Sequence, residues 1–218
     1  MTKEMRSAKD AYSRSLIRFD VVERVVHWSL AFLFFILIAT ALPLYFPSIE
    51  AIVGRRLLLA NIHTWVGIAL PIPLVIALFG NWGKGLRSDI GRFNLWTSDE
   101  VRWLKSLARD PMVELGKFNP GQKLNALFTG SVISVMLATG IILKWFNFFP
   151  LSWRTGATFV HDTFATLFVL VLAGHIFMAV THRKALRSML TGRIPSSWAE
   201  RHAPLWLRES NHESEDST

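Results

Sequence analysis

The sequence contains no cysteine, and this absence excludes several kinds of chemistry at once. Without thiols the chain cannot form a disulfide, hold an iron–sulfur cluster through thiolates or attach a haem covalently through a C-x-x-C-H motif. The cysteine ligands that are common in structural zinc sites are missing as well. Any cofactor of this chain is therefore expected to be bound non-covalently.

Charged residues are also scarce. They make up 18% of the 218 residues, against 51% hydrophobic residues that include nine Trp and sixteen Phe, and the mean hydropathy is positive. No internal repeat or low-complexity segment is apparent. This composition is typical of a small polytopic membrane protein and not of a soluble domain.

The apolar residues gather in four long stretches without charge. Each stretch has roughly the 20 residues that a helix needs to cross about 30 Å of hydrocarbon. The sequence therefore predicts an all-α membrane protein, a bundle of four transmembrane helices. The stretches are Val25–Ile49, Leu57–Gly83, Leu124–Leu143 and Thr163–His182.

An alternative is that the first stretch is a secretory signal, with Ala39-Thr40-Ala41 as its cleavage site. The residues before it argue against this, because they include four acids among the basic residues. The stretch is also long for the apolar region of a signal peptide. We therefore treat it as the first span.

The basic residues predict the orientation of the spans. Six Lys or Arg precede the first span, eight lie in the link from Lys84 to Lys123, and six follow from Arg183, whereas the other two links carry four together. This bias places both termini in the cytoplasm. Anionic lipid, and not nucleic acid, is the expected partner of the formal charge of +8.

Local signals refine the ends of the first two spans. Asp20 followed by Glu23 has the form of a capping box and should start the first helix. Pro43 and Pro47 should end or bend it, and prolines at 71 and 73 should kink the second span near its middle.

Outside the spans the sequence is more polar. Residues 98–109 read as a short amphipathic surface helix with Ser98 as its cap, and the acidic end NHESEDST is expected to be disordered. The predicted organisation is a mobile segment at 1–18, a transmembrane domain at 19–190 and a cytoplasmic tail at 191–218.

Four of the seven histidines lie within or close to the spans, where ionisable residues are rare and usually functional. These are His27, His63, His161 and His175, whereas the other three lie at or beyond the end of the fourth span. On a helix, the fourteen residues from His161 to His175 turn through about 1400° and rise about 21 Å, so both rings face the same side.

The predicted topology sorts these four histidines into two pairs at two depths. His63 and His161 lie near the outer side, and His27 and His175 lie near the cytoplasmic side. Zinc would need about four ligands at one point, whereas the two pairs are about 20 Å apart. Two haems b, each held by two imidazoles from facing helices, fit the arrangement. Such iron has no open position, which indicates electron transfer.

Two further features bear on this prediction. Glycines could let a macrocycle lie close to the helices, although glycine also serves ordinary helix packing in membranes. His182 is a rival to His175 as a ligand, but its position beside Arg183 and Lys184 places it at the headgroups. The glycines concerned are Gly67, Gly130, Gly140 and Gly174.

Together these residues resemble those of a known family, the membrane-bound cytochrome b (gamma) subunit of respiratory formate dehydrogenase. Similarity extends over about residues 18–208. Besides the pair His161 and His175, the stretches that carry it are ERVVHW (23–28), NIHTWVGIAL (61–70), GKFNPGQK (116–123) and MLTGRIPSSWAERHAPLWLR (189–208).

The resemblance implies a site and a set of partners. It implies two haems b on the same two histidine pairs, and a menaquinone or ubiquinone site at Asn119, Gly121 and Gln122 close to His175. From the residues alone, Asn119 and Pro120 read only as a helix start. The implied location is the bacterial inner membrane, with an iron–sulfur (beta) subunit and a molybdenum or tungsten catalytic (alpha) subunit as partners.

The expected function is electron transfer from the iron–sulfur subunit through both haems to a quinone near the cytoplasmic side, with no formate-oxidising site in this chain. Two alternatives stay open. The chain could be the haem b subunit of an uptake hydrogenase or related periplasmic oxidoreductase, which would keep every ligand. It could also be a haem-free transporter or scaffold, for which the broken second span is the best argument.

Overall fold

The computed structural model describes residues 15–110 and 112–215, which divide into two compact units. The first, here the bundle unit, consists of residues 25–83 and 128–174. The second, here the polar unit, takes its described residues from 1–24, 84–127 and 175–218. Three long helices contribute residues to both units.

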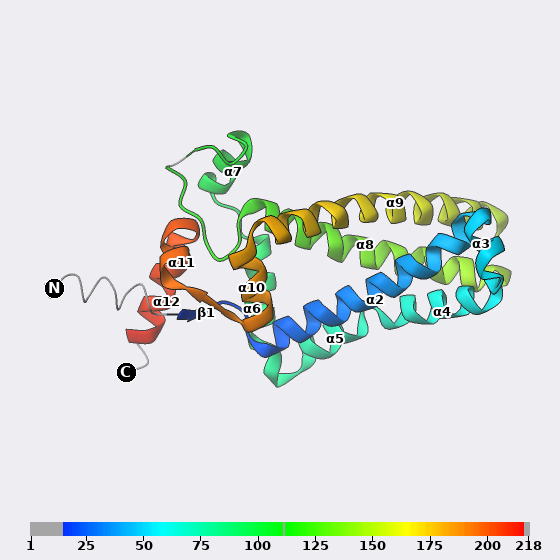
Figure 1. Cartoon of the computed structure of the whole chain (residues 1–218), viewed down its shortest axis with the longest axis horizontal. Coiled ribbons are helices and arrows are strands. Elements are labelled where there is room, and N and C mark those ends of the chain that lie inside the picture. The colour runs from blue at the N-terminus through cyan, green and yellow to red at the C-terminus, as the bar shows by residue number, and fades with distance from the viewer. Residues whose placement is uncertain (1–14, 111, 216–218) are drawn as a thin grey trace, which may run out of the picture. The chain divides into compact units, whose positions relative to one another are not determined.

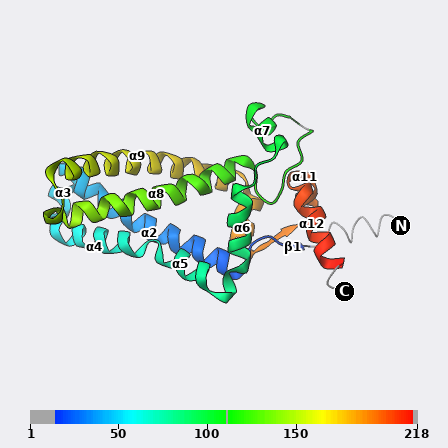
Figure 2. The same ribbon diagram turned by 180° about the vertical axis from the view of Figure 1, so that it is seen from behind.

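The bundle unit is built from four helical spans, each long and apolar enough to cross a membrane. In Figures 1 and 2 these spans run alongside one another within the unit. The elements are α2 (Val21–Tyr45), α3 (Pro47–Val53), α4 (Arg56–Ala69), α5 (Ile72–Phe79), a 3₁₀ turn (Asn81–Gly83), α8 (Pro120–Lys144), a second 3₁₀ turn (Phe146–Phe148) and α9 (Leu151–Thr181). The prediction of four spans is confirmed.

Prolines shape the second span as predicted. The span is broken into α4 and α5, with Pro71 and Pro73 at the start of α5. A proline removes one helix hydrogen bond and clashes with the preceding turn, which accounts for the break. Pro43 lies inside α2, which ends two residues later, and Pro47 opens the short helix α3.

Side chains on the outside of the spans are mostly apolar. Phe32, Phe35 and Leu170 are each more than half exposed, whereas the interior of the bundle unit holds Val132 and Phe168. Apolar side chains exposed on so many turns of four helices have no water-compatible role, and lipid is the solvent that suits them.

The polar unit contains most of the short elements. These are β1 (Ser15–Ile17), α6 (Lys84–Asn94), α7 (Ser98–Lys105), α10 (Arg183–Thr191), β2 (Arg193–Pro195), α11 (Ser196–His202) and α12 (Pro204–Glu215). Its small apolar core comprises Ile194, Ala199, Ala203 and Trp206. Of these elements, only α7 was predicted from the sequence.

The two-stranded sheet pairs a segment that precedes the first span with a segment that follows the fourth. Strand β1 pairs antiparallel with β2, Leu16 opposite Ile194, although we expected residues 15–18 to belong to a mobile segment; residues 1–14 lie outside the described residues. Leu16 packs on the apolar core, which gives the strand a reason to form. Gly192 precedes β2 with φ of 80°, and a β-carbon there would lie 2.6 Å from the Phe19 carbonyl oxygen. Only glycine fits this position.

Two local expectations need correction. The cap of α7 is Thr97 and not Ser98, because only Thr97 has Glu100 at the third helical position, where the two complete a capping box. The helix also ends at Lys105 instead of 109. The acidic end expected to be disordered is helical as far as residue 215, as the continuation of α12.

Candidate functional site

His63 and His161 face each other within the bundle unit. His63 lies on α4 and His161 on α9, and their ring centroids are 6.4 Å apart with ring planes inclined by 62°. Both side chains are half-buried. The structure thus brings together the two residues that the sequence predicts as the outer pair.

Each ring is held by a threonine from a neighbouring helix. The Thr40 hydroxyl on α2 lies 3.0 Å from His63 Nδ1, and the Thr139 hydroxyl on α8 lies 2.9 Å from His161 Nδ1. Both threonines are buried, at 6% and 8% exposure. Neither contact was predicted from the sequence.

The separation of the two rings suits a shared metal atom. Two imidazoles on opposite sides of one metal, with bonds of about 2 Å, place their centroids about 6 Å apart. Because the hydroxyls contact Nδ1, the ring nitrogen assigned to a metal is Nε2. The described residues contain no group of three or more His, Asp or Glu that could hold a metal ion. By its spacing, 6.4 Å between ring centroids, the pair fits the two axial ligands of a haem.

His27 and His175 lie in different units. His27 is half-buried on α2, with its ring edge-on to the Trp28 ring at 5.2 Å. His175 is exposed on α9, with Nδ1 3.5 Å from the Asn125 amide nitrogen. Their pairing as haem ligands stays a prediction.

His182, the rival ligand, is held at the end of its own helix. Its Nδ1 lies 2.9 Å from the Met178 carbonyl oxygen and 3.1 Å from the Thr181 hydroxyl. Among the candidate glycines, a β-carbon on Gly140 would lie 3.6 Å from His161 Cε1, and one on Gly67 would meet only Leu37. A β-carbon on Gly140 would therefore contact the ring of a predicted ligand.

The predicted quinone residues form the start of α8. The Asn119 side-chain oxygen accepts from the Gln122 backbone N–H at 2.9 Å, and the Gln122 side-chain oxygen accepts from the Asn119 N–H at 3.0 Å. This is a complete capping box, of which the sequence predicted only the Asn119 cap. The amide NH₂ of each side chain remains a donor. A β-carbon on Gly121 would lie 3.8 Å from Trp103.

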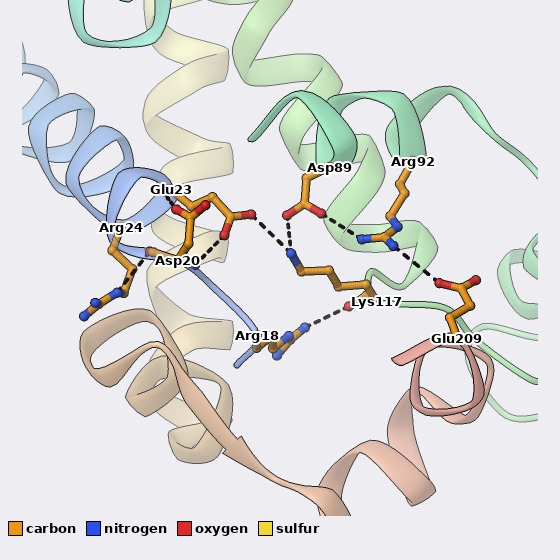
Figure 3. A network of polar contacts seen from close by, with 8 residues as sticks. All are labelled: Arg18, Asp20, Glu23, Arg24, Asp89, Arg92, Lys117 and Glu209. Carbon is orange, nitrogen blue, oxygen red and sulfur yellow. Dashed lines mark hydrogen bonds and ion pairs between the residues drawn. The ribbon is translucent and has the colours of Figure 1, made fainter. Parts of the chain in front are cut away.

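A buried ion network surrounds the segment just before α8 (Figure 3). Lys117 Nζ lies 3.2 Å from Glu23 Oε1 on α2 and 2.5 Å from Asp89 Oδ2 on α6. All three side chains are at most 7% exposed. The other oxygens are also satisfied, because Glu23 Oε2 accepts from the Asp20 N–H and Asp89 Oδ1 from Arg92. The bond from the Asp20 N–H to Glu23 Oε2 and the reciprocal bond from the Glu23 N–H to Asp20 Oδ1 together confirm the predicted capping box of α2.

Arg18 lies against this network. Its side chain is buried, and Nη2 donates to the Lys117 carbonyl oxygen at 3.1 Å. The guanidinium lies over the Trp198 ring, 4.5 Å from the centroid. Burial lowers the pKa of Arg18 to about 10, while the Asp89 carboxylate acts in the opposite direction. Aromatic stacking therefore compensates part of the cost of burying this charge.

A second buried lysine fixes the first turn of α8. Lys123 Nζ lies 2.5 Å from Glu100 Oε1 on α7 and donates to the Leu95 carbonyl oxygen at 2.6 Å. The GKFNPGQK stretch is thus held by a buried lysine on each side of its predicted quinone residues. The burial and pairing of these two lysines were not predicted from the sequence.

Comparison with known proteins finds relatives that match along most of this chain. Three curated relatives are the formate dehydrogenase cytochrome b556(fdo) subunit of Escherichia coli (strain K12), the nitrate-inducible cytochrome b556(Fdn) subunit of the same strain and the formate dehydrogenase cytochrome b556 subunit of Haemophilus influenzae. They are 26%, 24% and 25% identical, over 89%, 90% and 89% of this chain and 93%, 92% and 83% of their own lengths.

The family model that matches covers most of the sequence. Residues 18–192 match the family described as prokaryotic cytochrome b561, and this stretch includes all four predicted haem ligands. A cytochrome b family implies haem b. The four long apolar helices of this chain, together with the family, indicate a multi-pass membrane protein. The chain therefore belongs to the prokaryotic cytochrome b561 family.

Proposed function

We propose that this chain is the membrane cytochrome b subunit of a formate dehydrogenase complex. Electrons would pass from an iron–sulfur subunit through two haems b to a quinone near the cytoplasmic side, while a molybdenum or tungsten subunit oxidises formate. The names of the three relatives support this assignment of the complex. The bacterial inner membrane is the corresponding location.

The observation that carries the proposal is the facing pair His63 and His161, 6.4 Å between centroids, on two apolar spans. A haem held by two imidazoles supplies one-electron transfer without a coordination position for substrate. The residues of this chain then fix the cofactor, exclude water from it and orient the two rings. His27 and His175 are proposed to do the same for the second haem.

The orientation is proposed from charge. Both termini would lie in the cytoplasm because the segments before the first span, between the second and third spans, and after the fourth span carry twenty of the 24 Lys and Arg residues. The pair His63 and His161 would then lie on the side where the iron–sulfur subunit delivers electrons. Moving an electron inward across the membrane is worth about 2.3 kcal/mol per 100 mV.

The start of α8 supplies groups suited to a quinone. A quinone carbonyl accepts hydrogen bonds, and Asn119 and Gln122 each keep an amide NH₂ to donate, since their oxygens are engaged in the capping box. Asn125, one turn beyond Gln122, reaches His175. We propose that this segment binds the quinone beside the haem of His175.

Haem quantification on the purified complex tests the proposal most directly. We expect two haems b per chain by the pyridine haemochrome method, both reduced when formate is added. Two haems that respond to hydrogen and not to formate would move the chain to a hydrogenase. A folded protein without haem would contradict the proposal and favour the transporter or scaffold alternative.

Replacing Gln122 separates its two roles. Gln122→Ala removes both the cap and the NH₂ donor, whereas Gln122→Glu keeps an oxygen that can accept from the Asn119 N–H. If the Gln122 NH₂ donates a hydrogen bond to quinone, both variants should reduce quinone more slowly and keep their haem. Formate-dependent quinol formation is the measurement. Normal rates in Gln122→Glu would show that only the cap matters.

A further inference from the structure

The two threonines beside the outer histidine pair make the same set of contacts. Thr40 Oγ1 lies 2.8 Å from the Ile36 carbonyl oxygen, four residues back on its own helix, and 3.0 Å from His63 Nδ1. Thr139 Oγ1 lies 2.8 Å from the Val135 carbonyl oxygen and 2.9 Å from His161 Nδ1. Neither threonine is on a helix that carries a histidine of this pair.

These contacts bear on where the protons lie. The Thr40 hydroxyl has one proton and lies 2.8 Å from the Ile36 carbonyl oxygen and 3.0 Å from the Leu37 carbonyl oxygen, both of which can only accept. We assign the proton to these carbonyls; with this assignment the hydroxyl is the acceptor toward His63 and Nδ1 carries a proton. The same reasoning applies to Thr139 and His161. Both imidazoles are thereby set in the tautomer whose lone pair is on Nε2, the nitrogen that the facing geometry assigns to iron.

We propose that Thr40 and Thr139 are positioning residues for the outer haem. They fix the tautomer and ring plane of its two ligands and tune its reduction potential. This inference rests on the proposed ligation of a haem by His63 and His161. A hydrogen bond from Nδ1–H makes an imidazole a stronger donor to its metal, and the partners of metal-bound histidines typically affect metal affinity 10- to 100-fold.

The chemistry of the acceptor gives the expected direction. A threonine hydroxyl is a neutral acceptor, weaker than the carboxylate that many metal-bound histidines use. Removing it weakens the imidazole as a ligand and favours the reduced iron, which has the lower charge. The potential of the outer haem should therefore rise when either hydroxyl is lost.

The test uses isosteric variants in the intact complex. Thr40→Val and Thr139→Val remove the hydroxyl and keep the shape, and Thr40→Ser and Thr139→Ser restore it. Thr64→Val is the matched control, because the Thr64 hydroxyl bonds to the Ala60 carbonyl oxygen of its own helix, at 2.9 Å, and Thr64 neighbours His63 in sequence. Redox titration followed in the visible spectrum gives both haem potentials, and electron paramagnetic resonance of the oxidised haems reports the angle between the two ligand planes.

In the variant that combines Thr40→Val with Thr139→Val, we expect the reduced-to-oxidised ratio of the outer haem to rise about tenfold at a fixed applied potential. This corresponds to an increase of about 59 mV in its one-electron reduction potential. The second haem should stay unchanged, and serine should restore the first. A potential and resonance spectrum identical to those of the parent would overturn the inference, as would equal shifts of both haems or a matching shift in Thr64→Val. Retention of both haems in His63→Ala would instead remove the ligand assignment itself.

Discussion

Replacing His63 with alanine is expected to lower the haem content from two haems b per chain to one and to stop formate-dependent quinol formation. His161→Ala should have the same effect, because a bis-imidazole haem loses half of its protein bonds with either ligand. The measurements are haem per polypeptide and quinol formation in the purified complex. Added quinol should still reduce the remaining haem.

Matched histidine variants make this prediction specific. His182→Ala should keep both haems, because that ring is held by its own helix end, through the Met178 carbonyl oxygen. His27→Ala and His175→Ala should each remove the other haem, leaving the outer one reducible by formate. Two haems per chain in His63→Ala would contradict the assignment of the pair.

Lys117→Met is expected to destabilise the protein by about 3–5 kcal/mol, the usual cost of removing one partner from a buried ion pair. The change would leave two carboxylates, Glu23 and Asp89, buried without the ammonium they share. The temperature of unfolding of the detergent-solubilised protein measures the effect. A large decrease is expected.

Two further variants control for the size and charge of the change. Lys105→Met removes an exposed lysine from the last turn of α7 and should leave the unfolding temperature nearly unchanged. Adding Glu23→Gln to Lys117→Met should recover part of the loss, because it removes one of the uncompensated charges. Equal stability of Lys117→Met and Lys105→Met would show that the network contributes nothing.

The spans and the outer histidine pair could be predicted because their signals are local or nearly so. An apolar run of about 20 residues is expected to cross the membrane as a helix. Prolines at 71 and 73 break the helix within their own turns, so their effect does not depend on distant residues. The depth of a histidine follows from its place in a span. Because successive spans alternate in direction, the second and fourth spans run the same way, so His63 and His161, each early in its span, are predicted to lie at the same depth.

The polar unit was harder to predict because its contacts join residues far apart in the sequence. Lys117 meets Glu23 across 94 residues and Asp89 across 28. In the sequence each is one charged residue among many, and a charge outside an apolar run is normally solvated. Burial and pairing appear only when the elements are placed together.

The threonines illustrate the same limit inside the membrane. A threonine in a span commonly returns its hydroxyl to its own helix, as Thr64 does, so the residue type carries no signal for a ligand contact. Thr40 and Thr139 differ from Thr64 because each also contacts an imidazole on a neighbouring helix. That neighbour depends on packing and not on spacing.

The pairing of β1 with β2 has a consequence for biosynthesis. Strand β1 is translated before the spans, yet Arg193, whose guanidinium donates to the Ser15 hydroxyl, lies 178 residues later in the sequence. All four spans must be translated before this strand can find its partner. The small sheet can thus close only after the fourth apolar helix has been translated.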